Sequence, residues 1–235
     1  MPQLELPRPS VIRERIEAVK SERMRLYLMA LYLFAARASE LCGRVATCDL
    51  AKHRVAQVYG PTGDKVRVEP WQDETYPEIK AKVAVFEIMT AKRKPQGYLR
   101  NVGLPIDSDP WVPQLLDYWK AAGKGYVFPF NRYHADYYVK QNEVFKGLEY
   151  PIVKYKILGD AEPKIVEEHP HPLILHGLRH VRATELMERY NFNLEQVAVY
   201  GGWKIRTVQS VSPILVDRYL ALGYRFYVGK LLRPL

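Results

Sequence analysis

Apolar residues recur at helical spacing along the first part of the chain. Ser10 suits a helix N-cap, and apolar residues follow it at intervals of three and four from Ile12 through Val19. A second helix is expected from about Ser21 through a leucine-rich stretch. This pattern predicts a break near Ala35-Ala36 and then helix again as far as Cys42.

Residues 50 to 105 change to short runs of β-branched and aromatic residues separated by turn residues, which is typical of strands. The runs are Val55–Tyr59, Lys65–Val68, Lys82–Met89 and Tyr98–Leu104. They predict a small antiparallel sheet of three or four strands, with Lys92–Gly97 as a hairpin tip.

Helical periodicity returns after Asp109. The expected helices begin near Pro110, cover Tyr133–Leu148 and Leu173–Tyr190, begin again at Asn193, and end with a stretch from Ile205 or Pro213 to Leu222. Pro151–Ile157 is expected as a short strand, whereas the polar, proline-bearing segment Asp160–Pro172 is expected as a loop. The whole pattern predicts an α+β, mainly α-helical fold, in a single domain over residues 1–235.

The charge balance adds an expected partner. The chain has 235 residues, a formal net charge of +9, 48% hydrophobic residues and 26% charged residues. Such a composition predicts a globular domain that binds a polyanion, of which nucleic acid is the commonest. Two cysteines do not make a disulfide framework, and no apolar run has the length of a signal peptide or a membrane span. A soluble, cytoplasmic protein is expected.

The segment His-Gly-Leu-Arg-His, which begins at His176, carries the sharpest chemical signal. On a helix, His176, Arg179 and His180 share one face. A permanent cation beside two imidazoles suits a phosphate, although a solvated basic face or core histidines would give the same spacing. A zinc site built from these histidines with His169 and His171 is a further alternative, but the cysteines or carboxylates expected beside them are missing.

Segments in order along the chain resemble the conserved boxes of tyrosine recombinases, the integrase-type enzymes. The segment at His176, followed by Gly-Gly-Trp at 201–203, resembles the second box, and Ala36–Leu41 resembles the first arginine box. Lys92 lies at a predicted hairpin, as the lysine of the family does, and Asp217–Leu220 resembles the nucleophile segment. The resemblance covers most of the chain and implies the recombinase catalytic-domain fold.

The resemblance implies a site-specific DNA recombinase that cuts and rejoins double-stranded DNA through a 3′-phosphotyrosine, with no metal and no cofactor. Two guanidinium groups can donate paired hydrogen bonds to the phosphate as negative charge builds on its oxygens. The implied catalytic residues are Arg37, Lys92, His176, Arg179, Trp203 and Tyr219. Glu40 and His180 would orient them, and Arg93, Lys94, Lys204 and Arg206 would contact DNA.

Individual roles follow from the chemistry of each side chain. Tyr219 would attack the phosphate, and Lys92 would protonate the leaving 5′-oxygen, with its neighbours Arg93 and Lys94 as substitutes. For Arg37, a salt bridge to Glu40 on the same helical turn is the structural alternative.

Two departures from the family pattern leave alternatives open. The gap from Trp203 to Tyr219 exceeds the usual one by about two helical turns, so Tyr219 acts within its own protomer, acts on a neighbour, or is replaced by Tyr224 or Tyr227. The family's separate N-terminal DNA-clamping domain is expected to be absent, because Arg37 comes early. A type IB topoisomerase and a catalytically inactive DNA-binding protein of the same fold remain alternatives. Self-association as a tetramer on two duplexes is the expected assembly.

Overall fold

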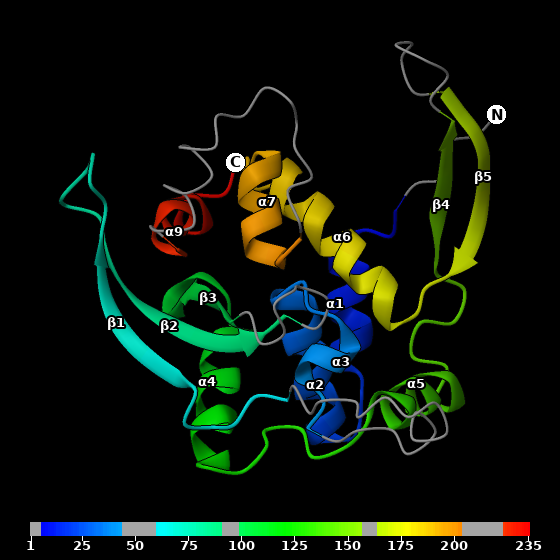
Figure 1. The fold of residues 1–235 in the computed structure, drawn as a ribbon, viewed down its shortest axis with the longest axis horizontal. Coiled ribbons are helices and arrows are strands. Elements are labelled where there is room, and N and C mark those ends of the chain that lie inside the picture. The colour runs from blue at the N-terminus through cyan, green and yellow to red at the C-terminus, as the bar shows by residue number, and fades with distance from the viewer. Residues whose placement is uncertain (1–5, 44–59, 91–98, 157–163, 204–222) are drawn as a thin grey trace.

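The computed structural model describes residues 6–43, 60–90, 99–156, 164–203 and 223–235 (Figure 1). Helices predominate, and the fold is α+β as predicted. The helices are α1 (Pro9–Glu17), α2 (Glu22–Leu33), α3 (Ala38–Leu41), the 3-10 turn η2 (Ile106–Ser108), α4 (Trp111–Ala122), α5 (Arg132–Gln141), α6 (Leu175–Glu188), α7 (Leu194–Gly201) and α9 (Arg225–Leu232). In the described ranges, no helix has both the length and the apolar character needed to cross a bilayer.

The strands form two antiparallel sheets in the described part of the chain. One sheet has the order β1 (Val66–Gln72), β2 (Lys80–Met89), β3 (Leu99–Pro105), and the other pairs β4 (Glu149–Lys156) with β5 (Lys164–Pro172). The β4–β5 hairpin projects from the body of the molecule, on the side opposite β1 (Figure 1). The three-stranded sheet therefore matches the predicted strand count, and the second sheet is an addition to it.

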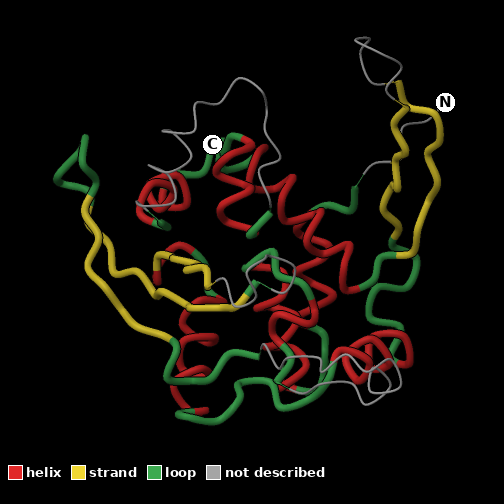
Figure 2. Tube along the Cα trace, viewed as in Figure 1, coloured by secondary structure: helices red, strands yellow, loops and turns green. Residues whose placement is uncertain are grey.

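Helix α2 is the centre of the fold (Figure 2). Its residues from Leu26 to Leu33 are all buried, because α1, α3, α4 and α6 contact it from different sides. Ser21 caps the start of the helix, and its side chain accepts a hydrogen bond from the Met24 N–H at 3.4 Å. It ends before Ala35, which has a φ of +47°, so the predicted break is confirmed at that residue.

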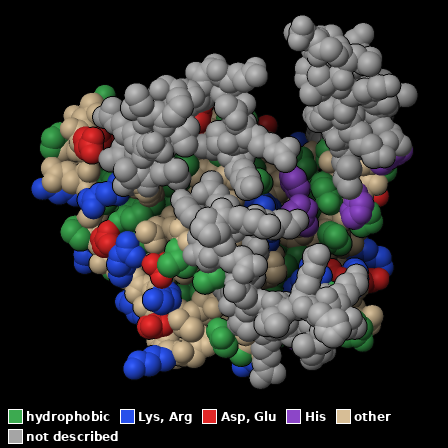
Figure 3. All heavy atoms as spheres, viewed as in Figure 1, with side chains coloured by type: hydrophobic (Ala, Val, Ile, Leu, Met, Phe, Trp, Pro, Cys, Tyr) green, Lys and Arg blue, Asp and Glu red, His purple; other side chains and the backbone are tan. Residues whose placement is uncertain are grey.

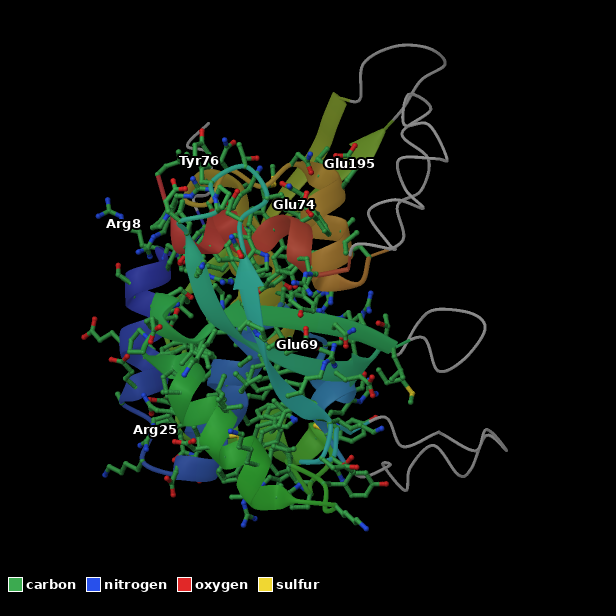
Figure 4. The ribbon with its side chains drawn as sticks, turned by 90° about the vertical axis from the view of Figure 1, so that its left-hand side faces the viewer. Arg8, Arg25, Glu69, Glu74, Tyr76 and Glu195 are labelled. Carbon is green, nitrogen blue, oxygen red and sulfur yellow. The ribbon has the colours of Figure 1, made fainter. Side chains whose placement is uncertain are left out.

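The three-stranded sheet lies between two helices. Phe86 on β2 packs against Trp119 of α4, with ring centroids 5.1 Å apart. Neighbouring residues of a strand point to opposite faces, so Val85 and its partner Gly103 on β3 face the other way. Helix α9 covers that second face, beside β1 and its labelled Glu69 (Figure 4). The central part of β2 and most of β3 are therefore buried, whereas β1 is mostly exposed or half-buried.

Strand β5 corrects the prediction that Asp160–Pro172 is a loop. Its residues pair with β4 in antiparallel register from Glu149↔Pro172 to Lys156↔Lys164. Proline cannot donate to a ladder, but a two-stranded ribbon has outward-facing edges where proline is tolerated. The prolines therefore hid the strand without preventing it.

One further boundary differs from the prediction, and two predicted elements cannot be compared with the structure. Helix α5 ends at Gln141 and not at Leu148, since Glu143 adopts a φ of +51° that a helix cannot continue through. The predicted strand Val55–Tyr59 and the predicted helix ending at Leu222 lie outside the described residues.

Candidate functional site

Arg37 and Glu40 form the first part of the site, at the start of α3. The backbone N–H of Arg37 donates to Glu40 Oε2 at 2.9 Å, and its Nη1 donates to Glu40 Oε1 at 2.8 Å. Glu40 is fully buried, whereas the side chain of Arg37 is 19% exposed. The salt bridge considered from the sequence is therefore present, and it fixes the guanidinium group at the edge of the protein interior.

Two more arginines from distant elements lie at the same carboxylate. Nη1 of Arg179, on α6, is 3.9 Å from Glu40 Oε2, and Nη2 of Arg100, on β3, is 3.7 Å from it. In the described part of the chain, three guanidinium groups thus converge on Glu40. Among these described groups positive charge is in excess, which is costly in a buried site unless an anion compensates it.

Arg179 is more deeply buried than Arg37, the other predicted catalytic arginine, with 1% of its surface exposed. Its Nη1 donates to the Ala35 carbonyl at 2.7 Å, while Nε and Nη2 have no hydrogen-bond partner within the described ranges. Burial lowers the pKa of Arg179, as does the nearby Arg37, whereas Glu40 raises it. A guanidinium group stays charged at neutral pH nevertheless. Arg179 therefore has two buried donors that are unsatisfied among the described residues, in a positively charged site.

The Gly-Gly-Trp turn places an indole against Arg179. Helix α7 ends at Gly201 and is capped by Gly202, which has a left-handed φ of +66°, and the Trp203 N–H then donates to the Ala198 carbonyl at 2.9 Å. A Cβ on Gly201 would lie 2.1 Å from the Trp203 ring. Both glycines are thus required, and they let the ring lie 3.9 Å from the guanidinium carbon of Arg179.

The two histidines of the motif lie at the exposed side of α6. The rings of His176 and His180 are 5.1 Å apart, and His180 stacks on Tyr150 of β4 at 5.8 Å. Partial desolvation and the neighbouring Arg179 lower the pKa of His180. Histidine side chains gather on this face, over α6 and beside the base of the β4–β5 hairpin (Figure 3). In the described ranges, no three His, Cys, Asp or Glu side chains are arranged to hold a metal ion.

The structure therefore brings Arg37, Glu40, Arg179 and Trp203 together, with His176 and His180 on the same helix as Arg179. Their catalytic roles remain predictions. The other predicted site residues lie outside the described residues, and these are Lys92, Arg93, Lys94, Lys204, Arg206 and Tyr219. Lys92 belongs to the connection between β2 and β3, which pair up to Met89↔Leu99.

The two alternative nucleophiles are core residues. The Tyr224 hydroxyl donates to Glu69, and the Tyr227 hydroxyl accepts from the Gly103 N–H at 3.1 Å. Burial raises the pKa of Tyr224 to about 12, and the bond to Glu69 adds to that effect. Burial raises the pKa of Tyr227 as well. Both hydroxyls are bonded within the core, and neither phenol ionises readily near neutral pH.

Arg100 is the site residue that the sequence reasoning missed. It resembles no local motif, and it lies inside a strand of mixed character. The alternation of β3 contains the signal, because Arg100 shares its face with Val102 and Leu104, which are both buried. A charged residue on the inward face of a strand is rare unless it is paired.

No family model matches the chain, and no curated protein matches it. Among solved structures, an integrase from mycobacterium phage Brujita is similar, with a TM-score of 0.46 and 15% sequence identity. The alignment covers 99% of this chain and 60% of that integrase, so this chain spans less than two thirds of its length. The assignment of a function rests on the residues of the chain itself.

Proposed function

We propose that this chain is the catalytic domain of a tyrosine recombinase, which cuts and rejoins double-stranded DNA through a 3′-phosphotyrosine. One observation carries the proposal. Arg37 and Arg179 lie on one buried carboxylate, and Arg179 keeps Nε and Nη2 unpaired in the described part of the chain. A phosphate oxygen would accept these hydrogen bonds and would neutralise the excess positive charge.

The proposed roles rest on the chemistry of each group and on its neighbours. Arg37 and Arg179 bind the non-bridging oxygens and stabilise the charge that develops in the transition state. Glu40 holds both arginines in position. The stacked ring of Trp203 keeps the guanidinium plane of Arg179 fixed. His176, at the exposed side of α6, assists proton transfer at the phosphate.

The covalent step is a displacement at phosphorus. The Tyr219 oxygen forms the new P–O bond and loses its proton, and the bond from phosphorus to the 5′-oxygen breaks. Lys92 donates the proton that the leaving 5′-oxygen requires. The reverse attack by a 5′-hydroxyl rejoins the strand and releases the tyrosine.

Tyr219 is favoured as the nucleophile because the alternatives are occupied. Tyr224 and Tyr227 are buried, and their hydroxyls are bonded to β1 and β3. Tyr219 precedes the anchored Tyr224 by few residues, and an extended chain of that length reaches about 17 Å. Attack within the same protomer and attack on a neighbour both fit this tether. We further propose that four protomers assemble on two duplexes.

The test is covalent trapping. The substrate is a labelled library of randomised duplexes, each with a nick. The short fragment that cleavage releases then dissociates, so the strand cannot be rejoined and the protein–DNA adduct persists. An adduct seen on a denaturing gel with the wild type and with Tyr224→Phe or Tyr227→Phe, but not with Tyr219→Phe, supports the proposal. An adduct that persists in Tyr219→Phe contradicts the nucleophile. DNA binding without any adduct indicates a binding protein of the same fold, and relaxation of a plasmid without strand exchange indicates a topoisomerase.

A further inference from the structure

Arg100 is a buried arginine that joins several parts of the candidate site. It is the second residue of β3 and is 6% exposed. Its Nη1 donates to the Tyr200 carbonyl, its Nη2 donates to the Phe34 carbonyl at 3.1 Å, and Nη2 also lies 3.7 Å from Glu40 Oε2. One guanidinium group therefore contacts three separate elements of the fold.

Each of these contacts is adjacent to a residue of the proposed site. Phe34 precedes Ala35, whose carbonyl accepts from Arg179. Tyr200 lies in the last turn of α7, immediately before the glycines that position Trp203. Glu40 holds Arg37. Arg100 thus contacts the supports of Arg37, Arg179 and Trp203 without being one of the proposed catalytic groups.

The packing around Arg100 is close. A Cβ added to Gly202 would lie 2.8 Å from Cδ of Arg100 and 3.1 Å from Oγ1 of Thr90. Thr90 directly follows β2. The left-handed turn at Gly202 therefore rests directly on the aliphatic part of Arg100. A change in this side chain would be transmitted to the turn.

We infer that Arg100 is a positioning residue for the strand-cleavage reaction, which sets Glu40 and the Gly-Gly-Trp turn in the arrangement that Arg179 needs. The inference rests on the proposed function and adds to it a residue that does not touch DNA. A buried arginine can also serve the fold alone, and an apolar residue of similar volume then replaces it without loss. Arg100→Met separates the two roles, because methionine fills the volume but bonds none of the three acceptors.

The experiment measures three quantities for each variant: the rate of adduct formation in a single turnover at saturating DNA, the Kd for the same DNA, and the melting temperature. For Arg100→Met we expect a cleavage rate lower by about 100-fold, as for a small misplacement of catalytic groups, with a Kd within about threefold of the wild type. Arg100→Lys keeps the charge but bonds fewer acceptors, so its cleavage rate should lie between those of the wild type and Arg100→Met.

Arg13→Met is the matched control. Arg13 pairs with Asp109 and lies 4.3 Å from the centroid of the Trp111 ring, so its loss also removes a largely buried guanidinium group. It should lower the melting temperature and leave the saturated rate near that of the wild type. A double variant of Arg100→Lys with Trp203→Phe should lose less rate than the product of the two single losses, because both act through Arg179.

The outcomes separate this inference from the proposed function. A wild-type adduct together with an undiminished rate in Arg100→Met overturns the inference and leaves the proposed function standing. Should Arg100→Met fail to fold, Arg100→Lys decides, since a wild-type rate in that variant and fully multiplicative losses in the double variant both contradict a positioning role. Absence of an adduct from the wild type removes the proposed function and the inference together.

Discussion

The guanidinium carbon of Arg179 lies 3.9 Å from the centroid of the Trp203 ring. The indole therefore covers one face of the cation, and on its edge Nε and Nη2 are buried and unpaired among the described residues. A desolvated contact of this kind is worth about 2 kcal/mol. Its geometric effect is as important, because it fixes the plane in which the two donors point.

Truncating the indole tests that contact. We expect Trp203→Ala to lower the single-turnover cleavage rate by about 10- to 100-fold, since the cation–π contact and the plane of Arg179 are lost together. Trp203→Phe keeps an aromatic face and should lose less. Adduct formation at saturating DNA measures both. Equal rates in the alanine and phenylalanine variants would show that the ring does not hold the arginine.

The forked hydrogen bonding of Arg179 predicts a strong response to a charge-conserving change. Arg179→Lys should lower the cleavage rate by about 10²- to 10³-fold, because a point charge cannot replace paired donors in the transition state. Arg37→Lys should behave alike. Kd measured on the same duplex should change far less than the rate. A lysine variant with the wild-type rate would mean that charge alone suffices.

Removing the charge of Glu40 should make the stability of the protein depend on added anions. Glu40→Gln leaves three guanidinium groups without their carboxylate, and breaking a buried ion pair costs about 3–5 kcal/mol. Urea unfolding should show this loss. Because inorganic phosphate can replace the missing charge, it should raise the melting temperature of this variant more than that of the wild type. Glu143→Gln, which removes an exposed pair with Lys146, is the control and should show neither effect.

Glu185 predicts how stability depends on pH. Burial alone would raise its pKa, but Arg182 and a hydrogen bond from Tyr32 together lower it below the usual 4.5. As pH falls, the Glu185 carboxylate therefore takes up its proton at a higher pH in the unfolded chain than in the folded protein. The contribution of Glu185 is complete above about pH 4.5 and is lost as pH decreases through the folded pKa.

Unfolding in urea between about pH 3 and pH 6 measures this contribution. Glu185→Gln should lower stability near neutral pH and should flatten the acid side of the profile. Glu188→Gln, an exposed position on the same helix, should keep the wild-type slope. An unchanged acid slope in Glu185→Gln would assign the pH dependence to other carboxylates.

Local pattern predicted much of the fold, because periodicity reports which residues face the core. The break at Ala35-Ala36, the strands β2 and β3 and the helix that carries Arg179 all follow from spacing within a short window. Strand β5 did not, since histidines and prolines interrupt its alternation and only pairing with β4 makes it a strand.

The site depends on contacts that no local window contains. Glu40 meets Arg37 within one helical turn, which the sequence predicted, but it meets Arg100 and Arg179 only after β3 and α6 pack around α2. A resemblance to known boxes pointed to Arg179. Arg100 lies in none of the segments that carried that resemblance, and its only local sign was an inward position on the same strand face as Val102 and Leu104.

The positive φ of Ala35 restricts which residues can occupy position 35. A left-handed backbone costs a non-glycine residue about 1–2 kcal/mol, and at this residue it directs a carbonyl to Arg179. Glycine would relieve that cost but would lose a buried methyl group, so the two effects nearly cancel. Selection for greater heat resistance should therefore exclude β-branched residues from position 35, because they adopt a left-handed backbone least readily.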